Sequence, residues 1–155
     1  METLRAWARA LATTGIVVAA DQATKQAAIR RVGDGGPIDV IFGFKLSNVR
    51  NDGIAFGLLE GAGDAAVIAL TLGALSVLVA YFGAHATRPD LWLAAGLTVG
   101  GALGNLADRV RIGAAIDFLD PPLWPAFNLA DIAIVAGVGL LVFAILSPEL
   151  GDSPT

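Results

Sequence analysis

The sequence predicts an all-α membrane protein with four transmembrane helices and a small β-rich extramembrane insert between the first two helices. Of the 155 residues, 55% are hydrophobic and 15% are charged, against about 25% charged in an ordinary soluble domain. The mean hydropathy is +0.70, and the apolar residues form long charge-free runs. Glycine-punctuated β-type runs follow the first apolar segment. This composition leaves too few polar residues for the surface of a soluble enzyme.

The same composition excludes several kinds of function. A net charge of −4 provides no basic footprint for nucleic acid. The chain has no cysteine, which excludes disulfides, thiolate nucleophiles and Cys-ligated zinc, and its single histidine, His85, excludes a two-His metal site. None of the four serines lies in a G-x-S-x-G motif. We therefore expect no metal and no cofactor, and any catalysis must depend on Asp, Glu or Lys.

The first apolar segment, residues 4–29, is the most polar of the four. Arg5 and Arg9 can extend towards one membrane interface, and Asp21 and Lys25 are spaced i,i+4 and can pair on one helix face. An alternative is a cleavable signal peptide, with small residues at 18–20 as its cleavage site. The polar but helix-favouring residues 21–28 favour a retained helix.

The remaining elements follow from charge-free runs and turn residues. Residues 33–60 contain short β-type runs at 38–42 and 44–49, separated by glycines and a proline, which predicts the β-rich insert. Spans are predicted at about 65–87, 91–107 and 129–148, because a bilayer requires roughly 17–25 apolar residues per helix. Three prolines between the last two spans exclude a continuous helix there.

Two features of these spans concern packing and orientation. Gly96, Gly100 and Gly104 repeat every four residues, a small-residue stripe that allows close helix approach in lipid. With the N-terminus inside, the inner segments hold three Lys and Arg residues and the outer segments hold seven. This count opposes the positive-inside rule, so composition alone does not orient the chain.

Polar side chains gather at one end of the predicted bundle, whichever way it is oriented. They are Asp21, Lys25, Asn51, Asn105, Asp108, Arg109, Asp117, Asn128 and Asp131. Charged groups at membrane depth are costly, which makes them functional candidates.

Most of these residues also have a purely structural interpretation. Asn128 and Asp131 have the spacing of a helix cap, Asp108 and Arg109 suit a solvated helix end, and Asp120 suits a turn. Asp117 is harder to explain in this way because its neighbours are apolar.

A pair of carboxylates is the chemistry that fits these residues. Two close Asp groups cannot both ionise cheaply, so one keeps a proton. The pair can then activate water as a base and protonate a leaving amine as an acid. Asn105 and Asn128 could fix the orientation of these carboxylates if the third and fourth spans pack together.

Five motifs in order resemble lipoprotein signal peptidase (signal peptidase II), the bacterial membrane aspartic peptidase. They are residues 21–25 (DQATK), 49–57 (VRNDGIAFG), 100–109 (GGALGNLADR), 116–118 (IDF) and 125–131 (PAFNLAD). Each motif is weak alone, but their order at the ends of four apolar spans is specific.

The resemblance implies a catalytic dyad of Asp117 and Asp131. It places Asn51, Asn105, Arg109 and Asn128 at the site, with Asp21 and Lys25 in supporting roles. The implied reaction is cleavage of a prolipoprotein before a diacylglyceryl-modified Cys, with membrane lipid around the acyl chains and no nucleic acid or metal. A monomer suffices. The implied location is the bacterial plasma membrane, with both termini cytoplasmic and the site at the outer face.

The chain also departs from the family pattern. The stretch from Asp117 to Asp131 is short and proline-rich, which leaves the reach of the loop over the substrate open; Asp52 and Ile54 differ from the usual residues. A small transporter or proton-relay protein and a scaffold whose Asp residues only cap helices are the alternatives. The chain has no internal repeat, and its acidic residues cluster away from the centre of the spans. Both features disfavour the transporter.

Overall fold

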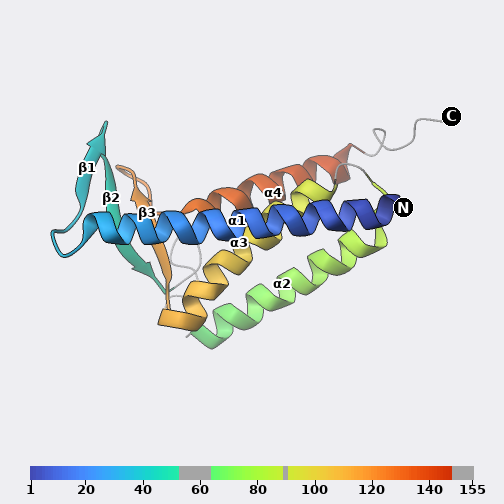
Figure 1. The fold of residues 1–155 in the computed structure, drawn as a ribbon, viewed down its shortest axis with the longest axis horizontal. Helices are drawn as coiled ribbons and strands as arrows, with labels where there is room; N and C mark the ends of the chain where they lie inside the picture. The colour runs from blue at the N-terminus through green and yellow to red at the C-terminus, as the bar shows by residue number, and fades with distance from the viewer. Residues whose placement is uncertain (53–63, 89–90, 148–155) are drawn as a thin grey trace.

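A computed structural model of the chain describes residues 1–52, 64–88 and 91–147. The elements are α1 (Glu2–Val32), β1 (Ile38–Ile41), β2 (Phe44–Asn51), α2 (Asp64–Ala84), α3 (Leu91–Ile112), β3 (Ala115–Asp120) and α4 (Leu129–Leu146). The helices run alongside one another, and the sheet stands across one end of them (Figure 1). The prediction of a mostly helical chain with a small β-rich part is confirmed. The rest of the predicted β-rich insert, residues 53–60, lies outside the described residues.

Helix α3 packs against all three other helices. A Cβ at Gly96 would lie 2.7 Å from Cβ of Thr13, and one at Gly100 would lie 2.7 Å from Cβ of Val17, both on α1. The expected close approach at the glycine stripe is therefore confirmed. Ala6 and Ala10 of α1 are buried in the core of the bundle, so the structure favours the retained helix over a cleaved signal peptide.

Two helices have the length and hydropathy to cross a membrane, judged over the described residues. They are Ala65–Ala84 and Leu129–Leu146, with only 17% and 22% of their most apolar windows buried. Apolar side chains such as Val77 and Phe143 are exposed, which suits a surface that faces lipid. Helices α1 and α3 carry the polar residues of the bundle end, which lowers their hydropathy. That all four helices cross the bilayer remains a prediction.

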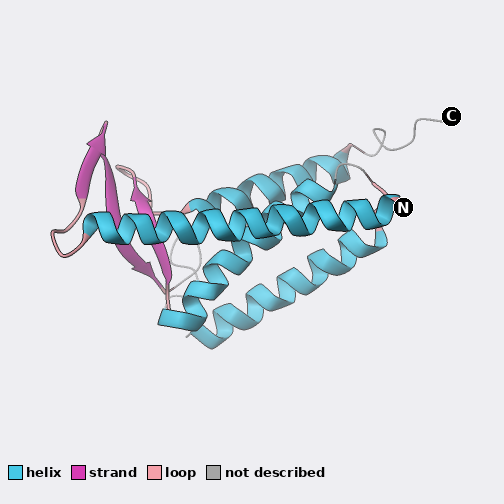
Figure 2. Ribbon diagram, in the orientation of Figure 1, coloured by secondary structure: helices cyan, strands magenta, loops and turns pink. Residues whose placement is uncertain are grey.

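The sheet is antiparallel in the order β1-β2-β3, and its third strand comes from the connection between α3 and α4 (Figure 2). The sequence predicted that the β-rich part lies wholly between the first two helices. This prediction is wrong in part, because β3 comes from a later connection. The residues Ala115–Phe118 are all buried, so the strand lacks the apolar–polar alternation that identifies a half-exposed strand. Asp120, expected in a turn, is the last residue of β3 and lies opposite Lys45.

Candidate active site

Two carboxylates from different elements line one cavity of about 620 Å³. Asp117 lies in the middle of β3, and Asp131 lies in the first turn of α4. The short chain between them is folded tightly, because the backbone of Phe127 pairs with Leu119 and returns along β3. This return places the start of α4 beside Asp117, so the short proline-rich connection brings the two acids together.

Each oxygen of both carboxylates accepts a hydrogen bond from an amide or a backbone N–H. The side chain of Asn51 donates to Oδ2 of Asp117 at 2.8 Å, and that of Asn128 donates to Oδ1 at 2.7 Å. For Asp131, the side chain of Asn105 donates to Oδ1 at 2.8 Å and the backbone of Asn128 donates to Oδ2 at 3.1 Å. These donors fix the orientation of both carboxyl groups.

Asn128 both caps α4 and holds the carboxylate pair. Its side-chain oxygen accepts from the backbone N–H of Asp131 at 2.9 Å, which completes a capping box. Its side-chain nitrogen donates to Asp117 and, at 2.9 Å, to Oδ1 of Asn105. The capping interpretation is confirmed, and the same geometry places Asn128 between the two acids. The two interpretations therefore do not compete.

Asp117 is only 1% exposed. The pKa of Asp117 is raised to about 6, mainly by burial and also by the nearby charge of Asp131, against the opposing effect of the Asn51 hydrogen bond. Repulsion between the two acids in a site of low polarity is the reason why such pairs retain a proton near neutral pH.

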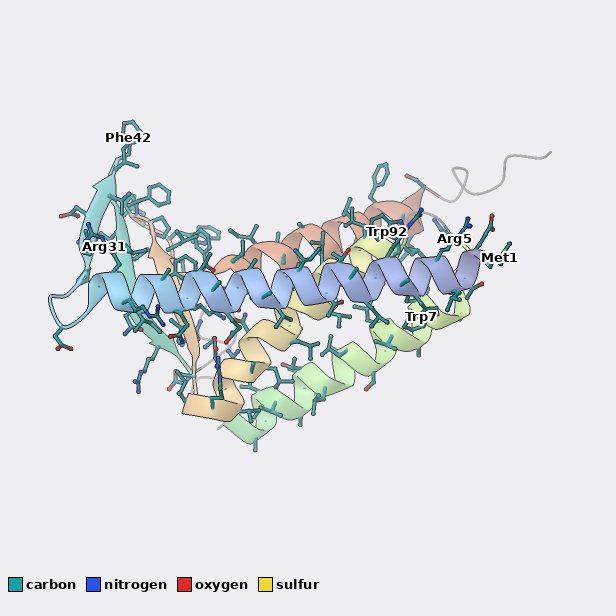
Figure 3. All side chains as sticks on the ribbon, viewed as in Figure 1. Met1, Arg5, Trp7, Arg31, Phe42 and Trp92 are labelled. Carbon is teal, nitrogen blue, oxygen red and sulfur yellow. The ribbon has the colours of Figure 1, made fainter. Side chains whose placement is uncertain are left out.

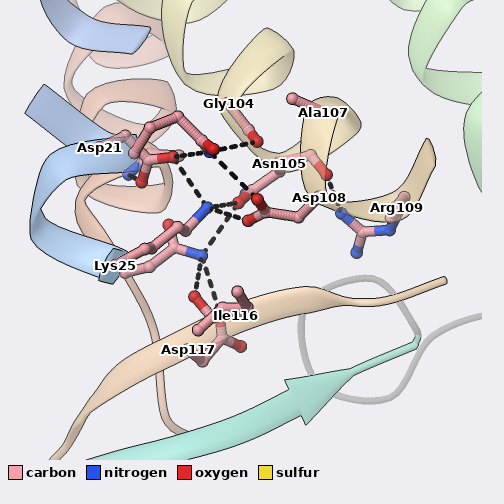
Figure 4. Close-up of polar contacts among 12 residues, drawn as sticks. Asp21, Lys25, Gly104, Asn105, Ala107, Asp108, Arg109, Ile116 and Asp117 are labelled. Carbon is pink, nitrogen blue, oxygen red and sulfur yellow. Dashed lines mark hydrogen bonds and ion pairs between the residues drawn. The ribbon is translucent and has the colours of Figure 1, made fainter. Parts of the chain in front are cut away.

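A second polar cluster lies next to Asn105 and Asp117 (Figure 4). The ammonium of Lys25 lies 2.8 Å from Oδ2 of Asp21, 2.7 Å from Oδ2 of Asp108 and 2.9 Å from Oδ1 of Asn105. The three charged side chains are each at most 1% exposed. The backbone N–H of Ala130 donates to Oδ1 of Asp21 at 3.0 Å, which ties α1 to α4. We call Asp21, Lys25 and Asp108 the lysine cluster.

The expected pairing of Asp21 with Lys25 is confirmed, but the interpretation of Asp108 as a solvated helix end is wrong. Asp108 is buried because α3 continues to Ile112 instead of ending at the predicted residue 107. The sequence contained a signal for this. The four-residue spacing of Gly96, Gly100 and Gly104 continues to Asp108, so this residue faces α1 with them.

The predicted site residues occupy two layers. Asn51, Asn105, Arg109, Asp117 and Asp131 line the cavity. Asn128, Asp21 and Lys25 lie behind them and are buried. The guanidinium of Arg109 donates to the backbone carbonyl of Asn105 at 3.4 Å (Figure 4). Among the described residues, no group of three His, Cys, Asp or Glu side chains is arranged to hold a metal ion.

Sequence reasoning missed the apolar wall of the cavity and two outer partners of the lysine cluster. Val67 of α2 and Ile132 and Val135 of α4 contribute to the wall. Gln22 and Arg111 both donate to Oδ1 of Asp108, at 3.1 and 2.7 Å. Apolar wall residues resemble any other lipid-facing residues in sequence, so no pattern distinguished them.

An apolar helical bundle with two amide-held acids in a cavity at its end has the features of a membrane enzyme. The family model described as "Signal peptidase (SPase) II" matches residues 13–147. The chain belongs to the signal peptidase II family and is a protease. This membership decides against the transporter, proton-relay and scaffold interpretations.

Curated relatives and solved structures agree with this assignment. The chain is 45% identical over 133 residues to the lipoprotein signal peptidase of Pelotomaculum thermopropionicum, covering 85% of this chain and 88% of the relative. It is 48% identical over 113 residues to that of Moorella thermoacetica, covering 72% and 75%. A solved bacterial membrane enzyme superposes with a TM-score of 0.82 at 30% identity, covering 94% of this chain and 93% of that one.

Proposed function

We propose that the chain is an aspartic endopeptidase that removes the signal peptide from prolipoproteins by cleaving before a diacylglyceryl-modified Cys. The observation that carries this proposal is that Asp117 and Asp131 share one cavity and have every oxygen held by an amide or backbone donor. The relatives' name, lipoprotein signal peptidase, supports the substrate class.

In the proposed reaction the pair holds one proton and binds a water molecule. The ionised carboxylate removes a proton from the water, and the oxygen of this water attacks the scissile carbonyl carbon. The protonated partner then donates its proton to the amide nitrogen of the leaving peptide, and the C–N bond breaks. The products are a new carboxyl end on the signal peptide and a free amine on the lipidated Cys. The raised pKa of Asp117, about 6, supports a carboxyl that keeps a proton to higher pH than an ordinary Asp does.

Other residues of the cavity bind the substrate in this proposal. Arg109 and Asn51 hold carbonyl oxygens of the peptide or the lipid ester, since arginine offers several donors in a fixed plane. The acyl chains lie against Val67, Ile132 and Val135 of the cavity wall, on helices that present apolar surface to lipid. Lys25 and Asp21 act indirectly, because Lys25 binds the same amide that donates to Asp131.

We also propose that all four helices cross the bacterial plasma membrane, with both termini cytoplasmic and the dyad at the outer face. Three of the seven cations that oppose this orientation have a local role. Lys25 and Arg111 are paired with Asp108, and Arg109 lines the cavity. The positive-inside rule describes unpaired loop charges, so these three weigh little against the proposal. One chain supplies every residue of the site, so a monomer suffices.

The test is a gel-shift cleavage assay with purified protein in detergent. The substrates are a diacylglyceryl-modified prolipoprotein and its unlipidated form, and the variants are Asp117→Asn and Asp131→Asn. Asp34→Asn, at an exposed position outside the site, is the matched control. We expect cleavage of the lipidated form only, lost in both dyad variants and kept in the control. Wild-type turnover in either folded dyad variant would contradict the mechanism, and equal cleavage of both substrates would contradict the lipid requirement.

A further inference from the structure

Two neighbouring loop ends of the sheet region expose large apolar side chains. Phe42, in the turn between β1 and β2, is 88% exposed, and Leu123, in the loop after β3, is 105% exposed. The two loops adjoin, because a Cβ on Gly43 would lie 3.5 Å from Cγ of Pro122. Figure 3 shows Phe42 at the outer end of the hairpin, away from the helices.

The backbone at both positions is unfavourable for the residues that occupy it. Among the described residues, Phe42 (φ 50°) and Leu123 (φ 63°) are the non-glycine residues with positive φ. Ile41 pairs with Phe44, so the turn has two residues, and Gly43 also has positive φ (81°). Two-residue hairpin turns of this kind favour Asn-Gly, and bulky side chains disfavour the left-handed region. Folding of the turns therefore does not explain these side chains.

Further exposed apolar residues extend the surface. We call Val40, Ile41, Phe42, Phe44, Leu123 and Trp124 the apolar tip; each is at least 41% exposed. Segments 40–44 and 121–124 contain no charged residue. The charged residues Asp39, Lys45 and Asp120 border it, where Lys45 is paired in register with each of the other two. An uncharged patch with a charged border is typical of a surface that enters an apolar phase.

We infer that the apolar tip inserts into the interfacial region of the bilayer leaflet next to the carboxylate pair. In Figure 1 the hairpin stands across the end of the helices, and its turn projects to the side of the bundle, level with the last turns of α1. The tip therefore lies just beyond the ends of the apolar helices, in the region where aromatic side chains favour the membrane interface. The inference rests on the membrane placement in the proposed function.

Insertion of the tip has a consequence for the site. Strand β2 ends in Asn51 and pairs with β3, which carries Asp117. Trp124 belongs both to the tip and to the lining of the cavity. A tip held in lipid thus fixes the sheet at the depth of the bilayer surface and places the mouth of the cavity against lipid. The lipidated part of the substrate can then enter without crossing water.

The test uses the absence of cysteine in the chain. Single variants Phe42→Cys and Leu123→Cys carry a nitroxide label in phosphatidylcholine nanodiscs, and Asp34→Cys, exposed at the start of the β-rich region, is the control. Collision rates with oxygen and with a water-soluble nickel chelate report depth. We expect the tip labels to be several-fold better protected from nickel than the control. Equal nickel access would overturn the inference, as would protection accompanied by dipolar broadening between labels, which would indicate a second copy.

A second variant excludes misfolding as the explanation. Phe42→Asn with Leu123→Asn removes the apolar groups and places at both positions a residue that tolerates positive φ. We expect its Tm in detergent to equal or exceed that of the wild type, while a label at Val40→Cys in nanodiscs loses its nickel protection. Retained protection would overturn the inference. Because these readings do not involve cleavage, they stand apart from the outcome for Asp117→Asn, which tests the chemistry.

Discussion

The lysine cluster and the carboxylate pair each contain two aspartates at the same end of the bundle, but the hydrogen-bonding partners of these aspartates differ. Asp21 and Asp108 bind the ammonium of Lys25 at 2.8 and 2.7 Å in buried ion pairs. Asp117 and Asp131 are held by amide and backbone donors and line a cavity. A buried acid that is paired with a cation keeps its charge and stabilises the fold. A buried acid that is held by amides beside another acid can exchange a proton.

Replacing each acid by Asn should separate the two groups most strongly. We expect Asp117→Asn and Asp131→Asn to lower turnover by about 10²–10⁴-fold or more, with no loss of Tm. Asp21→Asn and Asp108→Asn should instead lower Tm, because each leaves Lys25 with one buried anion fewer. Turnover per folded molecule and Tm of the four variants measure this. Equal losses of turnover at unchanged Tm in all four would erase the distinction.

Removing the cation should destabilise the fold more than any surface change. Lys25→Met leaves Asp21 and Asp108 buried without their shared partner, and breaking a buried ion pair costs about 3–5 kcal/mol. Arg111→Met is the control, since Arg111 also binds Asp108 but its side chain is 53% exposed, which limits the loss to about 1 kcal/mol. Thermal unfolding in detergent compares the two. If both variants unfold alike, the buried pairs do not stabilise the fold as we infer.

The raised pKa of Asp117 predicts a pH dependence of stability. The pKa rises from the ordinary 3.8 to about 6 on folding, so the folded state favours the protonated form. The resulting stability is fully present below pH 3.8 and is lost as the pH rises through 6, a difference of roughly 3 kcal/mol. Asp117→Asn should remove this dependence. Parallel Tm profiles of wild type and variant between pH 4 and 7 would contradict the assignment.

The sequence predicted the helices and most of the site because those signals are local. Charge-free runs marked the last three helices, and the spacing of Asn128 and Asp131 predicted a cap that the structure confirms. The interpretation of Asp117 as more than structural rested on a charge among apolar neighbours, and this residue is buried. Its catalytic role and that of Asp131 remain proposals.

The predictions from the sequence were wrong for residues that are buried by segments distant in the chain. Strand β3 was missed because its residues 115–118 are all buried, which removes alternation. Asp108 looked like a solvated helix end because its partner Lys25 is 83 residues away in the chain. The exposed Phe42 and Leu123 could not be recognised because nothing in the sequence sets φ at a phenylalanine or leucine. The pairing of β3 and the φ values of the two turn residues are set only in the folded chain, whereas the four-residue repeat from Gly96 to Asp108 was present in the sequence.

The smallest expected effect concerns the space beside the lysine cluster. A Cβ at Gly104 would lie 2.6 Å from Oδ2 of Asp21, an oxygen held by Lys25. Gly104→Ala should therefore move Asp21 or separate α1 from α3, at a cost of about 1–3 kcal/mol.

Gly15→Ala on α1 is the matched control for Gly104→Ala. Nothing lies within 4 Å of its added Cβ, so it should leave stability unchanged or raise it by up to about 1 kcal/mol through helix propensity. Since Lys25 also binds Asn105, we expect Gly104→Ala to reduce turnover modestly as well. Equal Tm values for the two variants would show that the lysine cluster tolerates displacement. Its geometry would then not set the position of the amide that donates to Asp131.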